Sequence, residues 1–352
     1  MALVVLPALD YFVGLVVLPK VKPSSETDTI SPTAENGISV IIACHNEVNH
    51  IELKVLEIHA QLKDASVNRY EIIVVSDGSE DGSNEVLEKL EKENKVVYNL
   101  VEKRQGKPNA LNVAIAISKF PLLLFSDVRQ SFERNAIKHL LSNLSDPKVG
   151  AVTAQLELEG DASPSRKFMN RLKQIESEKG STTGMCGALY VIRRELVLKP
   201  FPKDIILDDL LIALNVMKHS KRVVLEPLAI VHDVNWDLFY SGRRQGRITA
   251  GLVQILKHHR DLLYSIGLKQ LIFLYGQKYM KYVAPILFTL ASVVAVFTTS
   301  GIKFLHFAIS GALLTLILIL RPKFVLETLR LVLSYMAQLL KLDKYGKIKW
   351  ER

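Results

Sequence analysis

Between residues 38 and 126, short β-branched apolar runs alternate with segments of helical periodicity, and no other feature constrains the fold as strongly. Strands are predicted at 38–43, 70–75, 96–101 and 122–126, and helices at 48–62, 83–93 and 110–118. Strands free of polar interruptions and separated by helices are typical of a parallel sheet covered on both faces. The sequence therefore predicts an α/β domain.

Beyond residue 149 the alternation weakens, and the segments there are predicted one by one. We expect strands at 149–158, 188–192 and 222–225, a basic helix at 165–178 and a glycine-rich turn at 184–187. The apolar run 205–216 contains the adjacent carboxylates Asp208 and Asp209, at the expected first turn of a helix. Neighbouring like charges beside a buried element are costly unless a cationic or reactive group faces them. The pair is therefore our first candidate for catalysis.

The composition indicates a soluble domain with membrane segments, because 49% of the 352 residues are hydrophobic and 23% are charged. The net charge is +9, but no nucleic-acid-binding signature accompanies the scattered basic residues. Nucleic acid is therefore not an expected partner, and membrane lipids and phosphate-bearing substrates explain the charge better. Cys44 and Cys186 lack metal-ligand spacing, which favours a reducing cytosol for the catalytic portion.

Apolar segments flank the central region at both ends. Residues 2–19 are a marginal spanning helix or interfacial anchor, although a core helix stays open. Residues 282–302 carry no charge and residues 304–320 are nearly as apolar, so both segments are candidate transmembrane helices. The residues that follow are basic, which favours a cytoplasmic location for that end. We expect a multi-pass cell-membrane protein with four parts: an anchor (1–22), a linker (23–36), a cytoplasmic catalytic domain (37–260), and interfacial helices with about two transmembrane helices (261–352).

Polar clusters follow three of the predicted strands, at residues 44–47, 76–79 and 126–129. Ligands of parallel sheets bind beyond the carboxyl ends of the strands, so these clusters are candidate binding loops. Taken alone, Asp77 and Asp127 are equally well explained as residues that cap the next helix.

Seven sequence blocks in a fixed order give a more specific indication: IIACHNE (41–47), SDGS (76–79), GKPNALN (106–112), FSDVRQ (125–130), TGMCGALYVIRR (183–194), LDD (207–209) and RRQGRITAG (243–251). With these blocks the chain resembles the membrane-associated family-2 glycosyltransferases of the cellulose-synthase-like group. The resemblance covers about residues 37–251 and implies the GT-A fold, a Rossmann-like, mostly parallel sheet with helices on both faces.

The resemblance also implies roles in binding a nucleotide-sugar donor. Asp77 corresponds to the aspartate that accepts a hydrogen bond from the nucleobase, and Glu47 stands where the family lines the nucleotide pocket. Lys107 and Asn112 correspond to residues that lie along the donor, where a lysine offsets diphosphate charge.

A divalent metal, Mg²⁺ or Mn²⁺, is implied by Asp127, which matches the first aspartate of the family's Asp-x-Asp motif. The second position is Arg129. Either Asp127 holds the metal with His232 and diphosphate oxygens, or Arg129 takes over part of the charge neutralisation. For His232, an ordinary strand-end histidine with satisfied hydrogen bonds is the alternative.

For the chemical step, Asp208 and Asp209 match the family's acidic pair. The resemblance makes Asp209 the general base and Asp208 its positioning partner. A helix cap is the alternative. The loop beneath the acceptor corresponds to Gly184, Cys186 and Gly187, where small residues permit close approach of a sugar.

In the block at 243–251, Arg244 and Arg247 stand for the Gln and Arg of the Gln-x-x-Arg-Trp motif of processive relatives, and Ile248 replaces its tryptophan. The arginines would clasp the diphosphate, or alternatively face lipid headgroups. In processive relatives the tryptophan stacks on the acceptor sugar, so its absence argues against a polymer-extruding synthase.

We therefore expect an inverting glycosyltransferase that moves a sugar from a nucleotide-sugar donor, most simply UDP-linked, to a membrane-proximal glycan or lipid-linked acceptor in envelope or exopolysaccharide synthesis. A processive synthase of the same fold is the nearest alternative. A non-catalytic nucleotide-sugar-binding membrane protein is another, for which Arg129 is the main argument. The sugar, the linkage and the oligomeric state are left open.

Overall fold

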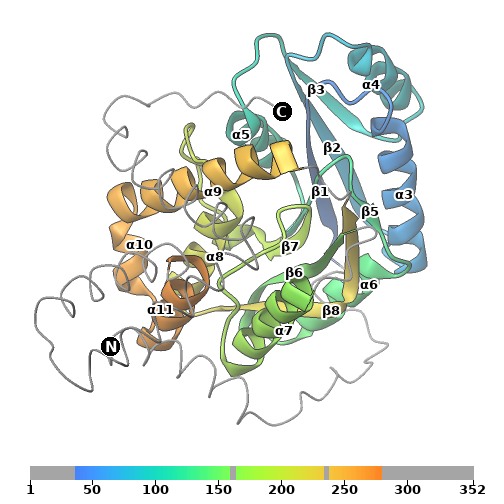
Figure 1. Cartoon of the computed structure of the whole chain (residues 1–352). Helices are drawn as coiled ribbons and strands as arrows, with labels where there is room; N and C mark the ends of the chain where they lie inside the picture. The colour runs from blue at the N-terminus through green and yellow to red at the C-terminus, as the bar shows by residue number, and fades with distance from the viewer. Residues whose placement is uncertain (1–35, 159–163, 234–237, 280–352) are drawn as a thin grey trace, which may run out of the picture. The chain divides into compact units, whose positions relative to one another are not determined.

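The computed structural model describes residues 36–158, 164–233 and 238–279 (Figure 1). Within these ranges the strands form one sheet in the order β3-β2-β1-β4-β7-β6-β8-β5. The strands are β1 (Ile38–Cys44), β2 (Tyr70–Asp77), β3 (Val97–Val101), β4 (Leu122–Ser126), β5 (Ser131–Phe132), β6 (Val149–Leu158), β7 (Leu189–Arg193) and β8 (Arg222–Asp233).

The first half of the sheet is parallel, as the sequence predicts. β1 pairs with β2 and with β4, and β2 pairs with β3, all in parallel. The second half is mixed, because β7 runs antiparallel to both β4 and β6, while β6 and β8 pair in parallel. The carboxyl ends of β2, β1 and β4 consequently lie side by side, which brings the three predicted binding loops to one edge of the sheet.

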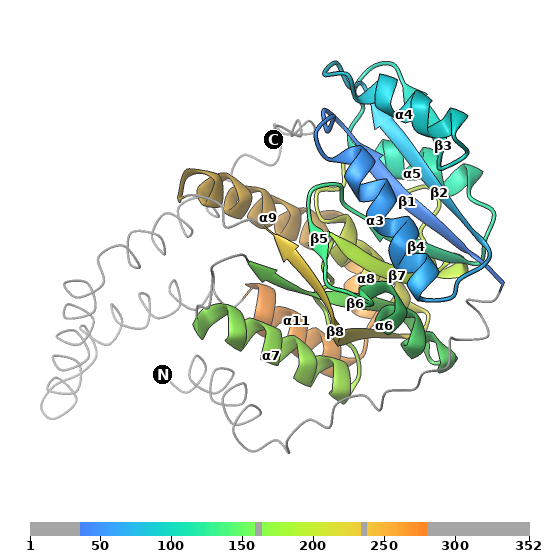
Figure 2. The same cartoon turned by 90° about the vertical axis from the view of Figure 1, so that its right-hand side faces the viewer.

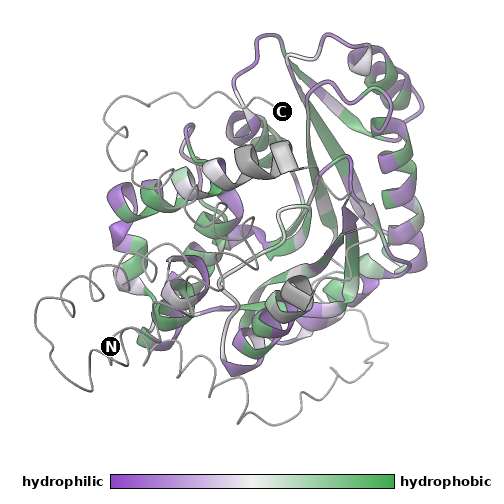
Figure 3. Cartoon of the chain, viewed as in Figure 1, coloured by the Kyte–Doolittle hydropathy of each residue, from purple (hydrophilic) through white to green (hydrophobic). Residues whose placement is uncertain are grey.

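Helices cover both faces of this sheet. The helices α3 (Ile51–Asp64), α4 (Ser83–Lys92) and α6 (Ala136–Ser142) pack on one face, and α5 (Lys107–Ile117) and α8 (Asp208–Lys218) on the other (Figures 1 and 2). The buried strands β1, β2 and β4 are mostly apolar, whereas the exposed positions of α3 and α4 are largely polar (Figure 3). This is the pattern expected of a sheet that is buried on both sides.

Several elements differ from the sequence-based expectation. β8 extends to Asp233, beyond the predicted end at residue 225, and β5 and α6 were not predicted. β5 has two residues and α6 seven, too few for a periodic signal. The other helices are α7 (Pro164–Lys179), α9 (Leu238–His258), α10 (Arg260–Ser265) and α11 (Leu268–Leu274), with a π-helical turn at Tyr275–Tyr279.

The described residues fall into two compact units. The first holds the sheet with its helices and residues 259–270, and the second holds α9 and residues 271–279. None of the described helices has both the length and the apolar character needed to cross a bilayer. The predicted anchor, the linker up to residue 35, and the spanning candidates 282–302 and 304–320 lie outside the described residues.

Candidate active site

The loops after β1 and β2 are hydrogen-bonded to each other at the carboxyl edge of the sheet, and the segment at Arg104 packs closely against them. The backbone N–H of Asn46, after β1, donates to Ser79 Oγ after β2 at 3.1 Å, and that of Glu47 donates to Ser83 Oγ at 2.9 Å. Gly78 has a φ of +64°, and a Cβ there would stand 2.6 Å from the backbone nitrogen of Arg104. Only glycine fits this close approach, so the loop sequence follows from the geometry.

Lys107, the first residue of α5, connects two carboxylates of the edge. Its Nζ is 2.8 Å from Asp127 Oδ1 and 3.7 Å from Asp208 Oδ2. Both partners are largely buried, with side-chain exposures of 20% for Asp127 and 11% for Asp208. The fold thus places a cation between the carboxylate that follows β4 and the one that begins α8.

Arg129 is held by Glu47. Its Nε lies 2.9 and 2.8 Å from the two carboxylate oxygens of Glu47, whose side chain is 1% exposed, whereas Arg129 keeps 36% exposure. A buried carboxylate requires such a partner. Glu47 therefore reaches the site through Arg129, and direct contact of Glu47 with a nucleobase stays a prediction.

Asp77 fixes the loop that leads into α5. Its two oxygens accept hydrogen bonds from the backbone N–H groups of Gln105 and Gly106, each at 2.7 Å, and the residue is 3% exposed. A carboxylate oxygen can accept more than one hydrogen bond, so Asp77 can also accept one from a nucleobase. Asp77 thereby also sets the position of Lys107.

The Asp77→Asn variant should lose both loop order and nucleotide affinity. The asparagine oxygen still accepts one backbone N–H, but the asparagine NH2 group faces the second backbone N–H, so two donors meet. The lost hydrogen bond should lower the free energy of unfolding by about 2 kcal/mol. We expect a lower melting temperature and roughly tenfold weaker binding of a nucleoside diphosphate. Calorimetric titration and thermal unfolding measure both. Asp64→Asn, at an exposed position of α3, is the control and should leave both values unchanged.

Asp209 lies half-buried in the first turn of α8, beside the glycine loop. A Cβ built on Gly187 would stand 3.8 Å from Asp209 Oδ2, an ordinary contact distance, so the glycine leaves room next to the carboxylate. Asp209 Oδ1 accepts the N–H of its neighbour Leu210 at 2.8 Å. The structure thus brings two of the predicted groups, the base and the acceptor loop, together.

Tyr190 of β7 is a site neighbour that the sequence did not indicate. It is 1% exposed, stacks on Phe125, and its hydroxyl has no hydrogen-bond partner among the described residues. Burial raises its pKa well above the ordinary value, and Asp208, Asp209 and Asp127 add to the rise. A tyrosine in a strand is ordinary, so no sequence signal distinguished it.

Asn112 is not aimed at an open donor surface. Its amide nitrogen donates to the carbonyl oxygen of Phe201 at 3.0 Å, and its amide oxygen accepts the N–H of Phe201 at 2.7 Å. Both polar ends of the side chain are thus engaged with the segment that leads to α8. We therefore leave Asn112 out of the proposed donor contacts.

The acceptor-loop residues Gly184 and Cys186 lie in the buried turn before β7. The N–H of Cys186 donates to Thr153 Oγ1 at 2.7 Å, and that of Gly184 to Thr182 Oγ1 at 3.3 Å. Burial raises the pKa of Cys186, and burial with the nearby Glu47 raises that of Cys44 to about 12. Both cysteines are therefore neutral thiols near pH 7.

Asp127 and Asp208 offer two carboxylates to a cation, and the ammonium of Lys107 lies between them. Within the part of the chain that the structure describes, no group of three His, Cys, Asp or Glu side chains is arranged to hold a metal. His232 Nε2 instead lies 3.1 Å from Glu133 Oε2. Mg²⁺ or Mn²⁺ here would thus be held by Asp127, with diphosphate oxygens and waters completing the coordination.

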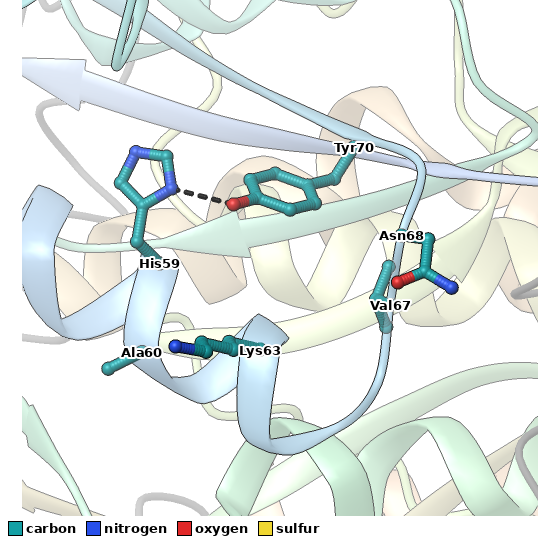
Figure 4. Close-up of a pocket in the computed structure, with 6 residues that line it drawn as sticks. All are labelled: His59, Ala60, Lys63, Val67, Asn68 and Tyr70. Atoms are coloured by element: carbon teal, nitrogen blue, oxygen red, sulfur yellow. Dashed lines mark hydrogen bonds between the residues drawn. The ribbon is translucent and has the colours of Figure 1, made fainter.

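Arg244 and Arg247 lie in α9, which belongs to the second compact unit. Their contact with a diphosphate stays a prediction. A cavity of about 410 Å³ lies elsewhere, where the end of α3 meets the start of β2 (Figure 4). His59 bonds there to the hydroxyl of Tyr70 and to the carbonyl oxygen of Lys95, both at 2.9 Å. This cavity faces the amino ends of the strands and takes no part in the site.

Comparison with known proteins gives a family match over part of the chain, which ends before Asp208 and Asp209. Residues 39–199 match the family model described as glycosyl transferase family 2. Poly-β-1,6-N-acetyl-D-glucosamine synthases are similar over part of their length. The enzyme of Staphylococcus aureus is 24% identical, and the match covers 59% of this chain and 51% of that enzyme. The enzyme of Staphylococcus epidermidis is 22% identical, and the match covers 55% of this chain and 49% of that enzyme. The chain thus spans about half the length of these curated relatives.

One solved structure has a similar fold. It is a mannosyltransferase from Pyrobaculum calidifontis in complex with GDP-mannose and Mn²⁺, with a TM-score of 0.71, 23% identity, and coverage of 98% of this chain and 97% of the other. At this identity the likeness shows the fold. It agrees with the mixed α/β sheet predicted from the sequence.

Proposed function

Because residues 39–199 form a family-2 glycosyltransferase domain, we propose that the protein is an inverting glycosyltransferase that moves a sugar from a UDP-linked donor to a membrane-proximal glycan or lipid-linked acceptor. The coarse activity, transfer from a nucleotide-sugar donor, follows from the family. The donor base, the acceptor and the role in envelope or exopolysaccharide synthesis are our proposal.

One observation carries the proposal: the ion-paired arrangement of Asp127, Lys107 and Asp208, with Asp209 next to Asp208 and close to Gly187. A nucleotide-sugar donor brings a diphosphate that needs cationic neighbours, and its displacement needs a base for the acceptor hydroxyl. Lys107 supplies the cation, and Asp209, the chain neighbour of its ion-pair partner Asp208, supplies the base.

In the proposed step the acceptor hydroxyl oxygen attacks the anomeric carbon while the bond from that carbon to the diphosphate oxygen breaks. Asp209 takes the hydroxyl proton, and the nucleoside diphosphate leaves with the bonding electron pair. Lys107 and Arg129 stabilise the charge that develops on the leaving group. A bound Mg²⁺ or Mn²⁺ would supply additional Lewis-acid stabilisation of the diphosphate. Direct displacement of this kind inverts the anomeric configuration.

We also propose that the protein acts at the cytoplasmic side of a membrane, as a multi-pass protein. The uncharged sequence 282–302 and the basic residues that follow residue 320 support this location. Tyr264 and Leu268 add to the argument, because they are 83% and 73% exposed and suit a lipid interface. Carbonate extraction of membranes from an expressing cell would release the full chain if the proposal were wrong.

A processive synthase of the same fold is the second candidate, favoured by the similarity to poly-β-1,6-N-acetyl-D-glucosamine synthases. Against it, Ile248 stands where processive relatives carry a tryptophan that stacks on the acceptor. Product length on a defined primer separates the two, since single transfer adds one sugar.

The test uses the purified full chain with UDP-linked and GDP-linked sugars, each with Mg²⁺, Mn²⁺ or a chelator. We expect sugar transfer or slow donor hydrolysis with one UDP-linked donor and a divalent cation. Turnover with a GDP-linked donor alone would show that the nucleobase of the donor is guanine and not uracil. Binding without any turnover would overturn the proposed activity in favour of a nucleotide-sugar-binding protein.

A further inference from the structure

Lys54 is a buried ammonium that the proposed chemistry does not use. It lies on α3 with 3% exposure, 2.5 Å from Glu57 Oε2, and it donates to the carbonyl oxygen of Gln130. The ammonium also stands 3.7 Å from the centre of the Phe132 ring. Lysines are almost never fully buried unless they are paired, so this position requires a specific reason.

The groups that contact Lys54 follow directly on the donor motif. Gln130 is the next residue after Arg129, and the N–H of Phe132 donates to Glu57 Oε1 at 2.7 Å. Thus the same ion pair that neutralises Lys54 holds the backbone on both sides of Ser131. Burial lowers the pKa of Lys54, and the carboxylates of Glu57 and Asp127 oppose this effect.

Three further contacts hold the same segment. About two turns beyond Lys54 on α3, Gln61 Nε2 donates to the carbonyl oxygen of Glu133 at 2.7 Å. On the opposite side, Gln130 Nε2 donates to Asp233 Oδ1 of β8 at 3.1 Å, and Ser131 pairs with His232. The segment after Arg129 is therefore fixed between α3 and β8.

We propose that Lys54 is a positioning residue for donor binding: through Gln130 and Glu57 it holds the loop that presents Asp127 and Arg129 to the diphosphate. The inference rests on the proposed function for its consequence, but the contact itself is independent of it. Arg129 is anchored by Glu47 just before α3, and Lys54 anchors the following residue from the first turns of the helix. Residues at the start of α3 and just before it thus hold both Arg129 and the residue that follows it.

The test replaces Lys54 by methionine, which keeps an unbranched chain over Phe132 and removes every bond of Nζ. We expect amide hydrogen exchange at residues 129–132 to accelerate at least several-fold relative to the wild type. We expect the Kd for UDP with Mn²⁺ to rise roughly tenfold, because a hydrogen bond from a charged group is lost. Lys89→Met is the matched control, since its exposed ion pair with Glu52 of α3 lies away from the loop.

A second variant separates positioning from general stability. Lys54→Met with Glu57→Gln leaves no unpaired charge and retains an oxygen for the N–H of Phe132, so the melting temperature should recover most of its loss. If Lys54 positions the loop, fast exchange and weak UDP binding persist in this variant. Recovery of both, or unchanged exchange in Lys54→Met, overturns the proposal. A wild-type chain that binds neither UDP nor GDP would contradict the proposed function, and loop exchange would still decide on Lys54.

Discussion

Asp209→Asn should lower sugar transfer by about 10³-fold, within the range that general bases contribute, and leave the donor Kd within about twofold. The amide cannot take the acceptor proton, yet its size and its position beside Gly187 are unchanged. Initial rates of transfer and calorimetric titration with the nucleoside diphosphate give the two values. A variant that still turns over at a tenth of the wild-type rate would exclude Asp209 as the base.

Asp208→Asn is the informative companion. Asp208 contacts Lys107, so its loss should weaken donor binding as well as transfer. If this variant instead lost transfer alone, the base assignment would move to Asp208. Asp261→Asn serves as the control, because Asp261 is 67% exposed and pairs with Lys218 at the surface, where ion pairs contribute little.

Asp127→Asn is expected to weaken donor binding roughly 100-fold and to abolish its dependence on a divalent cation. The substitution removes the carboxylate that faces Lys107 at 2.8 Å and that would hold the metal. Titration of UDP with Mn²⁺, Mg²⁺ and a chelator measures both effects.

The comparison variant for this test is Lys107→Met, which keeps Asp127 and removes the resident cation. We expect it to weaken donor binding while the response to a divalent cation is retained or increased, since the carboxylates are left without their ammonium. Metal-independent binding that is equal in wild type and Asp127→Asn would show that Lys107 and Arg129 alone neutralise the diphosphate.

Much of the first half of the fold was predictable. The apolar runs that become β1, β2 and β4 are buried on both faces, so their composition alone identifies them. The antiparallel orientation of β7 was not predictable, because a short apolar strand carries no sequence pattern that distinguishes parallel from antiparallel pairing. Nor was the true length of β8, whose second half alternates buried and partly exposed residues around Pro227.

For the site, the sequence predicted which residues gather at the edge but not how they pair. Lys107, Asp127 and Asp208 were each expected there, yet their ion pairs depend on the start positions of α5 and α8. Arg129 was identified as a departure from the motif, but its buried partner Glu47 is 82 positions away in sequence. Lys54 gave no signal, because Lys and Glu three residues apart on a helix usually form a solvated pair.

The helix α5 has a consequence for anyone who wishes to alter specificity. Its first residue, Lys107, forms an ion pair with Asp127. Asn112 lies about 7.5 Å further along the helix axis and forms two hydrogen bonds with Phe201, in the segment that leads to Asp209. If the proposed roles hold, a change that shifts this helix disturbs the donor site and the general base together.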